Sequence, residues 1–287
     1  MFVHLNIHSV YSAMRGLLSL TDMIKIARSY SMNTLALTDV NGIWGFIRFV
    51  QHCNNSEIRP IAGVNLMTDT QEVVILVENQ YGYENLCRII SDVHDDQTKL
   101  ISDILKNYSS GLFVLSHDVS TLKALKCFIP DTHLFIELRP GMEESAMQKL
   151  AKDLKLEIVV TGDVYFNKQS DHISHTILCA IDHNTTLEKL DLLKCKSDQH
   201  WFRNEEEMIK IFPNSLDALN NSQYLADRCK TDWSFINTIF PGLSLKDTYH
   251  SNRELKNKVF QGAKKRYGNI DEQVRSRIKY ELNIITQ

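Results

Sequence analysis

Apolar, strand-like segments alternate with helix-like segments over the first 161 residues, and this alternation is the strongest constraint on the fold. The segments predicted as strands are 2–7, 33–39, 59–66, 72–77, 111–115, 133–138 and 157–161. The helical patterns among them cover 20–29, 42–53, 82–93, 120–127 and 143–154. Strand and helix in turn are typical of βαβ units in a parallel sheet. Six or seven such strands favour an α/β barrel over an open sheet.

The alternation stops after residue 161, which suggests how the domains are organised. Helical patterns follow at 170–180, 204–212, 215–229, 252–267 and 271–286, with a less regular stretch at 231–250. We therefore predict one domain over 1–230, made of a barrel (1–165) and a helical completion (166–230). Residues 231–287 are predicted to be a linker and further helices.

Composition excludes several classes of protein. The chain has no apolar run near the ~18 residues of a membrane span and no secretory signal. Its six cysteines lack a Cys-x-x-Cys pair, which favours reduced thiols and a cytoplasmic location. Glycine patterns for a dinucleotide or a P-loop are absent. These features predict an ordinary globular protein without a membrane partner.

Charge is distributed unevenly. Residues 251–287 carry nine Lys and Arg against four Asp and Glu, a local charge of +5 within a chain whose net charge is −3. The cluster Lys264, Lys265 and Arg266 is the candidate nucleic-acid contact. The alternative, a helix end whose basic residues are merely solvated, stays open at this point.

The N-terminal segment holds the candidate site. Residues 2–7 alternate apolar and polar side chains, so His8 falls at the C-terminal end of the first predicted strand. In a barrel of parallel strands, this end faces the active site.

The frame Asn6-x-His8-Ser9-x-Tyr11-Ser12 resembles the opening motif of the polymerase-and-histidinol-phosphatase (PHP) domain, in the form found in bacterial DNA polymerase III alpha subunits. That motif is His-x-His-(Ser/Thr)-x-(Tyr/Phe)-Ser. Further segments resemble the same family in order: 35–42, 58–65, 82–86, 111–116, 201–208 and 226–229. The resemblance implies a distorted (β/α)7 TIM-like barrel followed by a mostly helical C-terminal extension.

The basic C-terminal stretch extends the resemblance. Leu255, Gly262, Arg266-Tyr267-Gly268 and 277–285 are similar to the segment that joins the PHP domain to the polymerase palm. The sequence is therefore expected to be an N-terminal fragment of a longer polymerase, ending before the catalytic palm aspartates that hold Mg²⁺. We expect no cofactor for the fragment itself.

Active PHP domains hold metal ions with His, Asp and Glu side chains. Two positions of this sequence match that ligand set, His8 and Asp163, and two more are aligned with less certainty, Asp92 and Asp118. The positions that depart from it are Asn6, Arg15, Val40, Asn65 and Tyr165.

These departures predict a degenerate site with no active catalytic residue. Arg15 is permanently charged and would repel a nearby metal ion by several kcal/mol at ~4 Å. Val40 offers no lone pair. We expect no metal, or at most one held by His8 and Asp163. An ion pair of Arg15 with Asp163 or Asp39 is a hypothesis for what replaces the metals.

A second candidate cluster lies on one predicted helix. His172, His175, Cys179 and His183 follow at offsets of three, four and four, a spacing that can bind zinc. The simpler interpretation is a half-buried helix with ordinary His and Cys in the core, and this interpretation is favoured.

The resemblance implies a DNA-directed DNA polymerase, a nucleotidyltransferase of DNA replication, for the full chain. This domain would act as a scaffold for the rest of the polymerase chain, for a proofreading exonuclease subunit and for other replisome subunits. DNA would be bound through the longer polymerase chain. One alternative is a metal-dependent phosphoesterase or 3′–5′ exonuclease using His8, Asp92, Asp118, Asp163 and the His172 cluster. Another, a phosphatase of histidine synthesis, is disfavoured by the basic C-terminal stretch.

Overall fold

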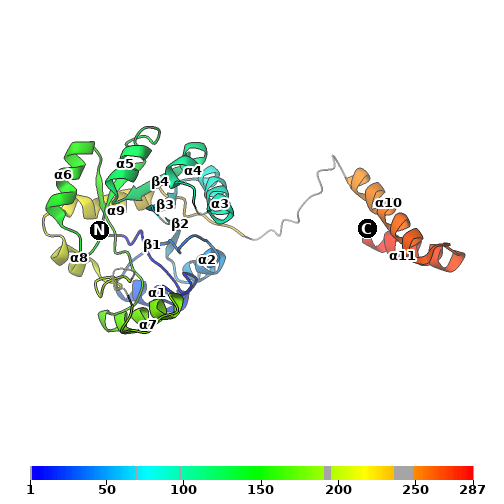
Figure 1. Cartoon of the computed structure of the whole chain (residues 1–287), viewed down its shortest axis with the longest axis horizontal. Coiled ribbons are helices and arrows are strands. Elements are labelled where there is room, and N and C mark those ends of the chain that lie inside the picture. Colours follow the sequence, from blue (N-terminus) through cyan, green and yellow to red (C-terminus); the bar gives the residue numbers. More distant parts are fainter. Residues whose placement is uncertain (1, 69, 97, 191–194, 236–247, 287) are drawn as a thin grey trace. The chain divides into compact units, whose positions relative to one another are not determined.

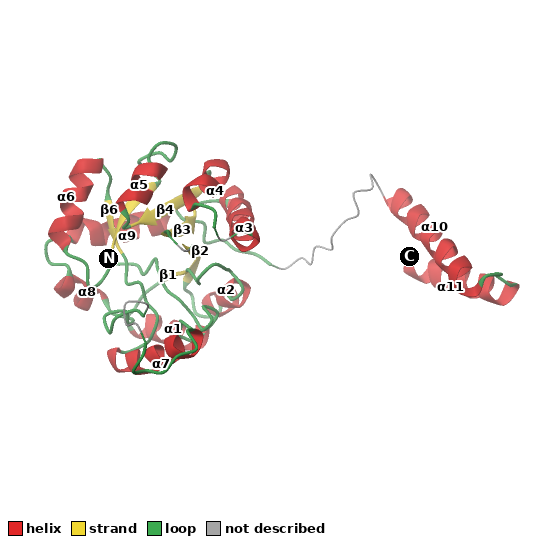
Figure 2. Cartoon of the chain, viewed as in Figure 1, coloured by secondary structure: helices red, strands yellow, loops and turns green. Residues whose placement is uncertain are grey.

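The structure, a computed structural model, describes residues 2–68, 70–96, 98–190, 195–235 and 248–286. The chain divides into two compact units, Met1–Ser234 and Phe235–Gln287. In the first unit the strands lie inside a ring of helices (Figures 1 and 2). Among the described residues, no helix is long and apolar enough to cross a membrane.

The elements of the first unit follow the predicted alternation closely. The strands are β1 (Thr34–Leu37), β2 (Arg59–Met67), β3 (Glu72–Val77), β4 (Leu112–Ser116), β5 (Leu134–Leu138) and β6 (Ile158–Val160). The helices around them are α1 (Leu20–Ser29), α2 (Phe46–Asn54), α3 (Gln80–Asp95), α4 (Ile101–Tyr108), α5 (Val119–Leu125) and α6 (Glu144–Leu154). After them come η1 (Gln169–Asp171), α7 (His172–Asp182), α8 (Glu205–Ile211) and α9 (Leu216–Arg228).

The sheet is mixed, and the prediction of an all-parallel sheet is wrong at one strand. The strand order is β1-β2-β3-β4-β5-β6, and β3 runs antiparallel to both of its neighbours. The other neighbouring pairs are parallel. Only residues 68–71 connect β2 to β3, and so short a loop joins antiparallel strands because a parallel pair needs a crossover. The reversal brings Glu72, the first residue of β3, beside the C-terminal end of β2.

The N-terminal segment lies between β1 and the residues after β6, and it closes the ring of strands. On one side Ala36 N–H donates to His4 O and Thr38 N–H donates to Ile7 O. On the other side His8 N–H donates to Val164 O. The prediction of a regular strand over 2–7 is wrong. Between its two hydrogen bonds to β1, this segment advances by three residues, from His4 to Ile7, while β1 advances by only two, from Ala36 to Thr38. This extra residue is a bulge, and only isolated bridges form.

The barrel interior is apolar and closed at one end by α9. Its inner cluster takes alternate residues from the strands and side chains from α9: Val3, Leu5, Ala36, Ile61, Val74, Leu76, Phe113, Leu115, Phe135, Val159, Leu225, Ala226 and Cys229. The opposite faces of the strands pack against the outer helices in a larger cluster. Both faces of the sheet are therefore buried, and the fold is a distorted α/β barrel of the TIM-like kind.

One glycine pair fixes the entry of α3. Asn79 Oδ1 accepts the Gly82 N–H at 3.0 Å and caps the helix. A Cβ on Gly82 would lie 1.9 Å from the carbonyl oxygen of Gly111, so the two backbones can approach only because residue 82 has no side chain. The glycines at 82 and 111, each the first residue of a predicted element, thus hold α3 against the start of β4.

The second unit contains α10 (Thr248–Tyr267) and α11 (Glu272–Ile285). These agree with the helices predicted at 252–267 and 271–286. Asp271 caps α11 by accepting the Val274 N–H at 2.8 Å. Most of the stretch predicted as irregular, residues 236–247, lies outside the described residues.

Candidate functional site

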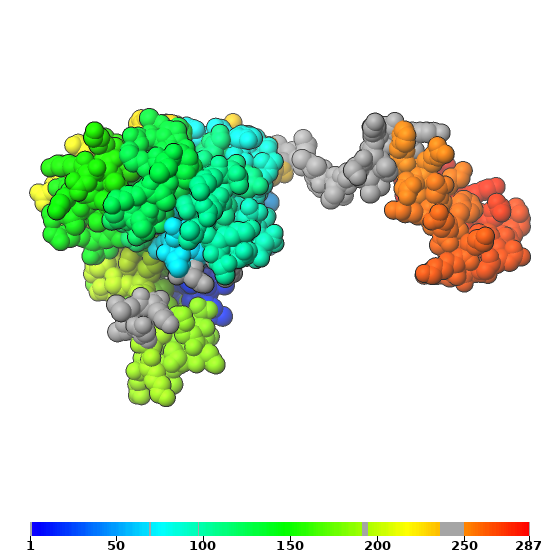
Figure 3. Space-filling model, turned by 45° about the horizontal axis from the view of Figure 1, so that its top comes forward, coloured from blue at the N-terminus to red at the C-terminus, as the bar shows by residue number. Residues whose placement is uncertain are grey.

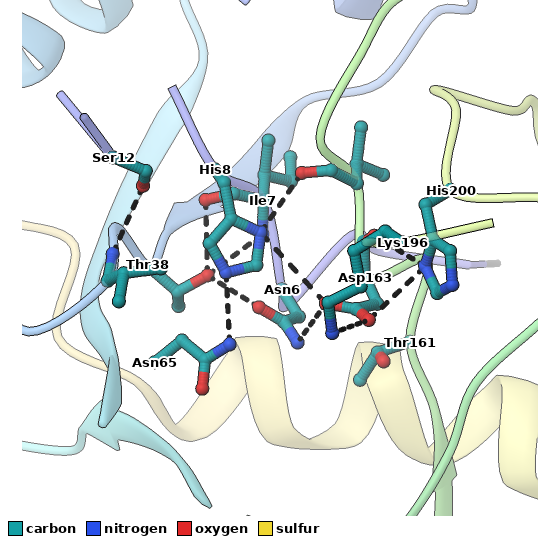
Figure 4. Close-up of polar contacts among 12 residues, drawn as sticks. Asn6, Ile7, His8, Ser12, Thr38, Asn65, Thr161, Asp163, Lys196 and His200 are labelled. Carbon is teal, nitrogen blue, oxygen red and sulfur yellow. Dashed lines mark hydrogen bonds and ion pairs between the residues drawn. The ribbon is translucent and has the colours of Figure 1, made fainter. Parts of the chain in front are cut away.

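A buried polar cluster lies where the strands of the barrel end. It is formed by side chains from the N-terminal segment, the strand ends and the stretch before α8 (Figure 4). Its members are Asn6, His8, Asn65, Glu72, His117, Glu137, Arg139, Asp163, Lys196 and His200. The parallel strands present their C-terminal ends here, and β3 begins here because it is reversed.

Asn6 links two acidic groups of the cluster. Its side-chain NH2 donates to Glu137 Oε1 at 3.0 Å and to Asp163 Oδ1 at 3.3 Å. Its side-chain oxygen accepts from Thr38 Oγ1 at 2.9 Å. With its NH2 donating to two carboxylates and its oxygen accepting from Thr38, the Asn6 amide ties the carboxylates together.

His8 is fully buried and both of its ring nitrogens have partners. Nδ1 lies 3.1 Å from Val164 O, and Nε2 lies 3.1 Å from the side-chain nitrogen of Asn65. Because a carbonyl only accepts, we assign the proton to Nδ1, and Nε2 then accepts from the amide. Burial lowers the pKa of His8 to about 3, so the ring is neutral.

Asp163 is the most heavily paired carboxylate. Its Oδ2 lies 3.1 Å from an Arg139 guanidinium nitrogen, 2.8 Å from Lys196 Nζ and 3.2 Å from His200 Nδ1. Burial by itself would raise the pKa of Asp163, but Lys196 and Arg139 outweigh it and hold that pKa well below its usual range. The carboxylate is therefore ionised, and two cations share its charge.

Arg139 lies at the centre of the acidic groups. Its guanidinium bonds Glu72 Oε1 at 2.8 Å, lies 3.4 Å from Glu137 Oε2 and contacts the ring of His117. Only 3% of Arg139 is exposed. A buried arginine requires such partners, since its charge cannot be removed by deprotonation.

The pKa values of the remaining titratable groups shift in different directions. Burial would raise the pKa of Glu72, but Lys196 and Arg139 together lower it. For Glu137, burial dominates and raises the pKa. Burial and the charge of Arg139 lower the pKa of His117 to about 4. The negative charges of Glu72 and Asp163 are thus balanced by the positive charges of Arg139 and Lys196.

Arg15 does not pair with Asp163 or Asp39, so that hypothesis is wrong. An Arg15 guanidinium nitrogen lies 3.3 Å from Sδ of Met67. Asp39 instead accepts from Ser9 N–H at 2.7 Å and from Ser12 Oγ at 2.6 Å. Arg139 and Lys196 provide the cations that were expected from Arg15.

The other positions that depart from the family's ligand set are Val40, Asn65 and Tyr165, and they lie in or beside the cluster. Val40 pairs with Asn65 in an isolated bridge, and its N–H donates to Ser12 Oγ at 3.1 Å. Asn65 donates to both His8 and Glu72 Oε1. The Tyr165 ring stacks on His8 with centroids 3.9 Å apart. Asn65 and Tyr165 therefore contact His8 directly, and Val40 lies beside Asn65.

Asp92 and Asp118 are not part of the cluster. Asp118 precedes α5, and its Oδ2 accepts the Thr121 N–H at 2.6 Å as a helix cap. Asp92 lies on α3, and its backbone carbonyl accepts from Asp96 N–H near the helix end. In the described structure neither aspartate contacts the polar cluster, so their assignment as ligand positions stays a prediction.

The sequence interpretation missed six residues of the cluster: Glu72, His117, Glu137, Arg139, Lys196 and His200. Four of them had a signal, since Glu72 starts a predicted strand and Glu137, Arg139 and His117 lie at or just after predicted strand ends. Lys196 and His200 lie in an irregular stretch. No pattern in that stretch indicates which side chains reach the barrel.

The helix with the alternative zinc ligands is α7. His175 Nδ1 lies 2.8 Å from Arg15 O, and Lys196 N–H donates to Nε2 at 3.2 Å. His175 and Cys179 are buried, whereas His183 is exposed. Over the described ranges, no group of three His, Cys, Asp or Glu side chains is arranged to hold a metal ion.

The residues at the strand ends do not fit a metal cluster. Divalent ions need several anionic or imidazole ligands with free lone pairs. Here the lone pair of His8 Nε2 takes the Asn65 amide, and Asp163 and Glu72 already bind Arg139 and Lys196. The chemistry of this donor set is that of a neutralised ion-pair network.

Comparison with known proteins places this geometry in context. A family model described as "PHP domain" matches residues 4–158. The chain is 28% identical over 329 residues to an error-prone DNA polymerase of Symbiobacterium thermophilum, covering 100% of this chain and 30% of that protein. It is 25% identical over 329 residues to DNA polymerase III subunit alpha of Treponema pallidum, covering 100% and 28%. A third relative, DNA polymerase III subunit alpha of Buchnera aphidicola, is 30% identical over 263 residues, covering 79% and 23%. The chain thus spans less than a third of the length of these relatives.

Proposed function

The chain belongs to the PHP domain family, and from this premise we propose that it is the PHP domain of a DNA polymerase III alpha-type polymerase, acting as a scaffold without metal catalysis. The printed names of the relatives and the share of their length that is matched support this proposal. DNA-directed DNA synthesis, with Mg²⁺ at palm aspartates, would then be the activity of the longer protein in the bacterial cytoplasm.

One observation carries the scaffold assignment. Arg139 and Lys196 lie within 3.1 Å and 2.8 Å of Asp163, at the strand ends where a metal-dependent member of the family would concentrate negative charge. A divalent ion in this position would face two fixed positive charges. Repulsion of several kcal/mol at ~4 Å separation opposes binding.

The exposed face of α7 supports a docking role. Ile173, Ile177 and Ile181 are 69%, 43% and 56% exposed, and their spacing of four residues places them in one stripe. The helix stands out from the body of the first unit at the lower edge of Figure 3. We propose that the rest of the polymerase chain covers this stripe, since the relatives are more than three times as long. A proofreading exonuclease subunit remains a second partner for the scaffold.

The proposed boundaries are 1–230 for the PHP domain and 231–287 for the connection to the palm.

The metal content of the purified chain tests the proposal. We expect elemental analysis after dialysis against Mn²⁺ or Zn²⁺ to find far less than one ion per chain, and no hydrolysis of a phosphodiester substrate. A His8→Gln variant should give the same result as the wild type. Stoichiometric metal together with hydrolysis that His8→Gln abolishes would instead establish the phosphoesterase or 3′–5′ exonuclease alternative.

The basic end of α10 is the proposed nucleic-acid contact. Lys264, Lys265 and Arg266 lie in its last turn and are exposed. Replacing all three by glutamine is expected to weaken binding of double-stranded DNA and to reduce the salt dependence. Each lost phosphate contact lowers the slope of log K against log salt by about 0.9.

The control for this measurement is a variant with three exposed lysines of the first unit, Lys149, Lys152 and Lys155, replaced by glutamine. Both variants lose three positive charges, so a non-specific charge effect would weaken them equally. Equal salt slopes in fluorescence-anisotropy titrations would argue that 264–266 are merely a solvated helix end.

A further inference from the structure

Two cysteines lie side by side where α7 meets the stretch before α8. Cys179 and Ala180 of α7 form a small buried cluster with Leu190, and Cys195 packs against this cluster. The thiols of Cys179 and Cys195 are in hydrogen-bonding contact with each other, and both cysteines are reduced. The two residues do not form a Cys-x-x-Cys motif, so it is the fold that brings them together.

The other four cysteines have neighbours of a different kind in the described structure: Cys53, Cys87, Cys127 and Cys229. Two of them belong to separate apolar core clusters. Cys87 is hydrogen-bonded to Tyr83, and Cys127 is exposed, with its thiol donating to Lys123 O at 3.5 Å. Among the described residues, a contact between two thiols therefore distinguishes the pair at α7.

His175 brings a proton acceptor to this pair. Its Nδ1 lies 2.8 Å from Arg15 O, and because a carbonyl only accepts, we assign the proton to Nδ1. The lone pair of Nε2 then faces Cys179 Sγ at 3.5 Å and the Lys196 N–H at 3.2 Å. Burial lowers the pKa of His175, so the ring is neutral at pH 7 and can take the proton of the thiol.

The two thiols differ in their access to solvent. Cys179 is only 5% exposed, and burial raises the pKa of its thiol to about 12. Cys195 is half-buried. Both residues line a cavity of about 370 Å³ between the barrel and α7, which is large enough to admit a small oxidant. Such an oxidant therefore reaches Cys195 first and finds Cys179 beside it.

We propose that Cys179 and Cys195 form a redox modification site, at which a hydroperoxide converts the two thiols to a disulfide. In the first step the Cys195 sulfur attacks a peroxide oxygen, an S–O bond forms and the O–O bond breaks. The leaving oxygen takes up the thiol proton and departs as an alcohol, or as water from hydrogen peroxide. Cys195 is thereby oxidised to a sulfenic acid, and the peroxide is reduced.

In the second step the neighbouring thiol resolves the sulfenic acid. Cys179 passes its proton to His175 Nε2, and its sulfur attacks the sulfur of Cys195, so that the S–S bond forms and the S–O bond breaks. The departing hydroxide takes the proton from His175 and leaves as water. Two thiols and one hydroperoxide thus give one disulfide, one alcohol and one water.

The disulfide joins α7 to the residue that precedes Lys196. The Lys196 Nζ binds Asp163 at 2.8 Å, so oxidation connects α7 covalently to a member of the buried charge network. Neither the scaffold role nor the DNA contact at α10 uses this thiol pair.

Mass spectrometry of the reduced chain after treatment with equimolar hydrogen peroxide tests the site. Alkylation of the denatured protein should fall from six thiols per chain to four, with a cross-link between the tryptic peptides of Cys179 and Cys195. Dithiothreitol should restore all six. Cys179→Ser should abolish the cross-link and leave a sulfenic acid at Cys195, which dimedone traps.

His175→Gln tests the proton transfer. The variant keeps a polar side chain but loses the base, so the cross-link should form at least about tenfold more slowly. Dimedone labelling of Cys195 should rise in the same samples, because the sulfenic acid then waits for the second thiol. A purely structural His175 would not change the amount of trapped sulfenic acid.

Cys127→Ser is the matched control, because Cys127 is exposed and lies outside this site. It should form the cross-link as fast and as fully as the wild type. The inference is overturned if the cross-link is absent at a peroxide dose that oxidises Cys127, or if Cys127 enters disulfides equally. Failure of dimedone to label Cys195 in Cys179→Ser would also overturn it. The metal content that tests the proposed function is a separate measurement, so each can fail without the other.

Discussion

Replacing Arg139 with alanine is expected to lower the free energy of unfolding of the first unit by about 3–5 kcal/mol. The variant removes the cation that contacts Glu72, Glu137 and Asp163, and it leaves the charges of Glu72 and of the fully buried Asp163 with less compensation. For a unit of this size, the loss corresponds to a fall of about 10 °C in melting temperature. Circular dichroism melts measure it directly.

Arg59→Ala is the matched control. Arg59 also binds a carboxylate, Asp227, at 2.8 Å, but both side chains are about half exposed. Surface ion pairs contribute about 0–1 kcal/mol, so this variant should melt within about 3 °C of the wild type. If Arg139→Ala melts as Arg59→Ala does, the ion-pair network does not replace a metal centre. Asp163→Asn provides a second variant, which should also be strongly destabilised because Arg139 and Lys196 lose a shared partner.

The stability of the first unit should fall steeply as the pH drops below about 6.5. His4, His8 and His117 are buried to different extents, and burial lowers their pKa values to about 4, 3 and 4. In the unfolded chain these rings take up protons near pH 6.5. Between pH 6.5 and 4, the unfolded state therefore binds up to three more protons than the folded state.

The sign of the effect follows from this difference. A group whose pKa is lower in the folded state stabilises the protein above pH 6.5, and this stabilisation is lost as the pH falls toward the folded pKa. For three such groups, the free energy of unfolding changes by at most about 4 kcal/mol per pH unit. The lowered pKa values of Asp163 and Glu72 extend the loss below about pH 4. Glu137 acts in the opposite direction, because its raised pKa gives stability that is present at low pH and lost as the pH rises through that pKa.

Denaturant unfolding between pH 4.5 and 7.5 measures the slope. We expect His117→Gln, which keeps a polar group at the half-exposed edge of the cluster, to reduce the slope by about one proton. His183→Gln changes an exposed histidine and should leave the slope as in the wild type. A wild-type slope near zero between pH 5 and 6.5 would show that these three histidines titrate as they do in the unfolded chain.

Local patterns were sufficient for most of the elements and for the family. The largely apolar segments at 59–66, 72–77 and 133–138 became β2, β3 and β5, because a strand buried on both faces is apolar over most of its length. The helix α4 was not predicted, since it has only eight residues and follows a polar stretch. The strand pattern placed His8 at a strand end, whereas Asn6, Asn65 and Asp163 were found because they occupy motif positions of the family that the sequence resembles. The sequence also indicated that Arg15 and Val40 depart from a metal-binding set.

Tertiary structure alone decided which charges meet. Arg139, Lys196 and Glu72 come from separate parts of the chain, and they converge on Asp163 only because β3 reverses and the barrel closes through the N-terminal segment. The sequence by itself determined the α/β alternation, the family frame and the loss of family ligands, since these depend on neighbours along the chain. It could not determine that Arg139 and Lys196, and not Arg15, neutralise the site, because ion pairing depends on distances that only the folded barrel sets.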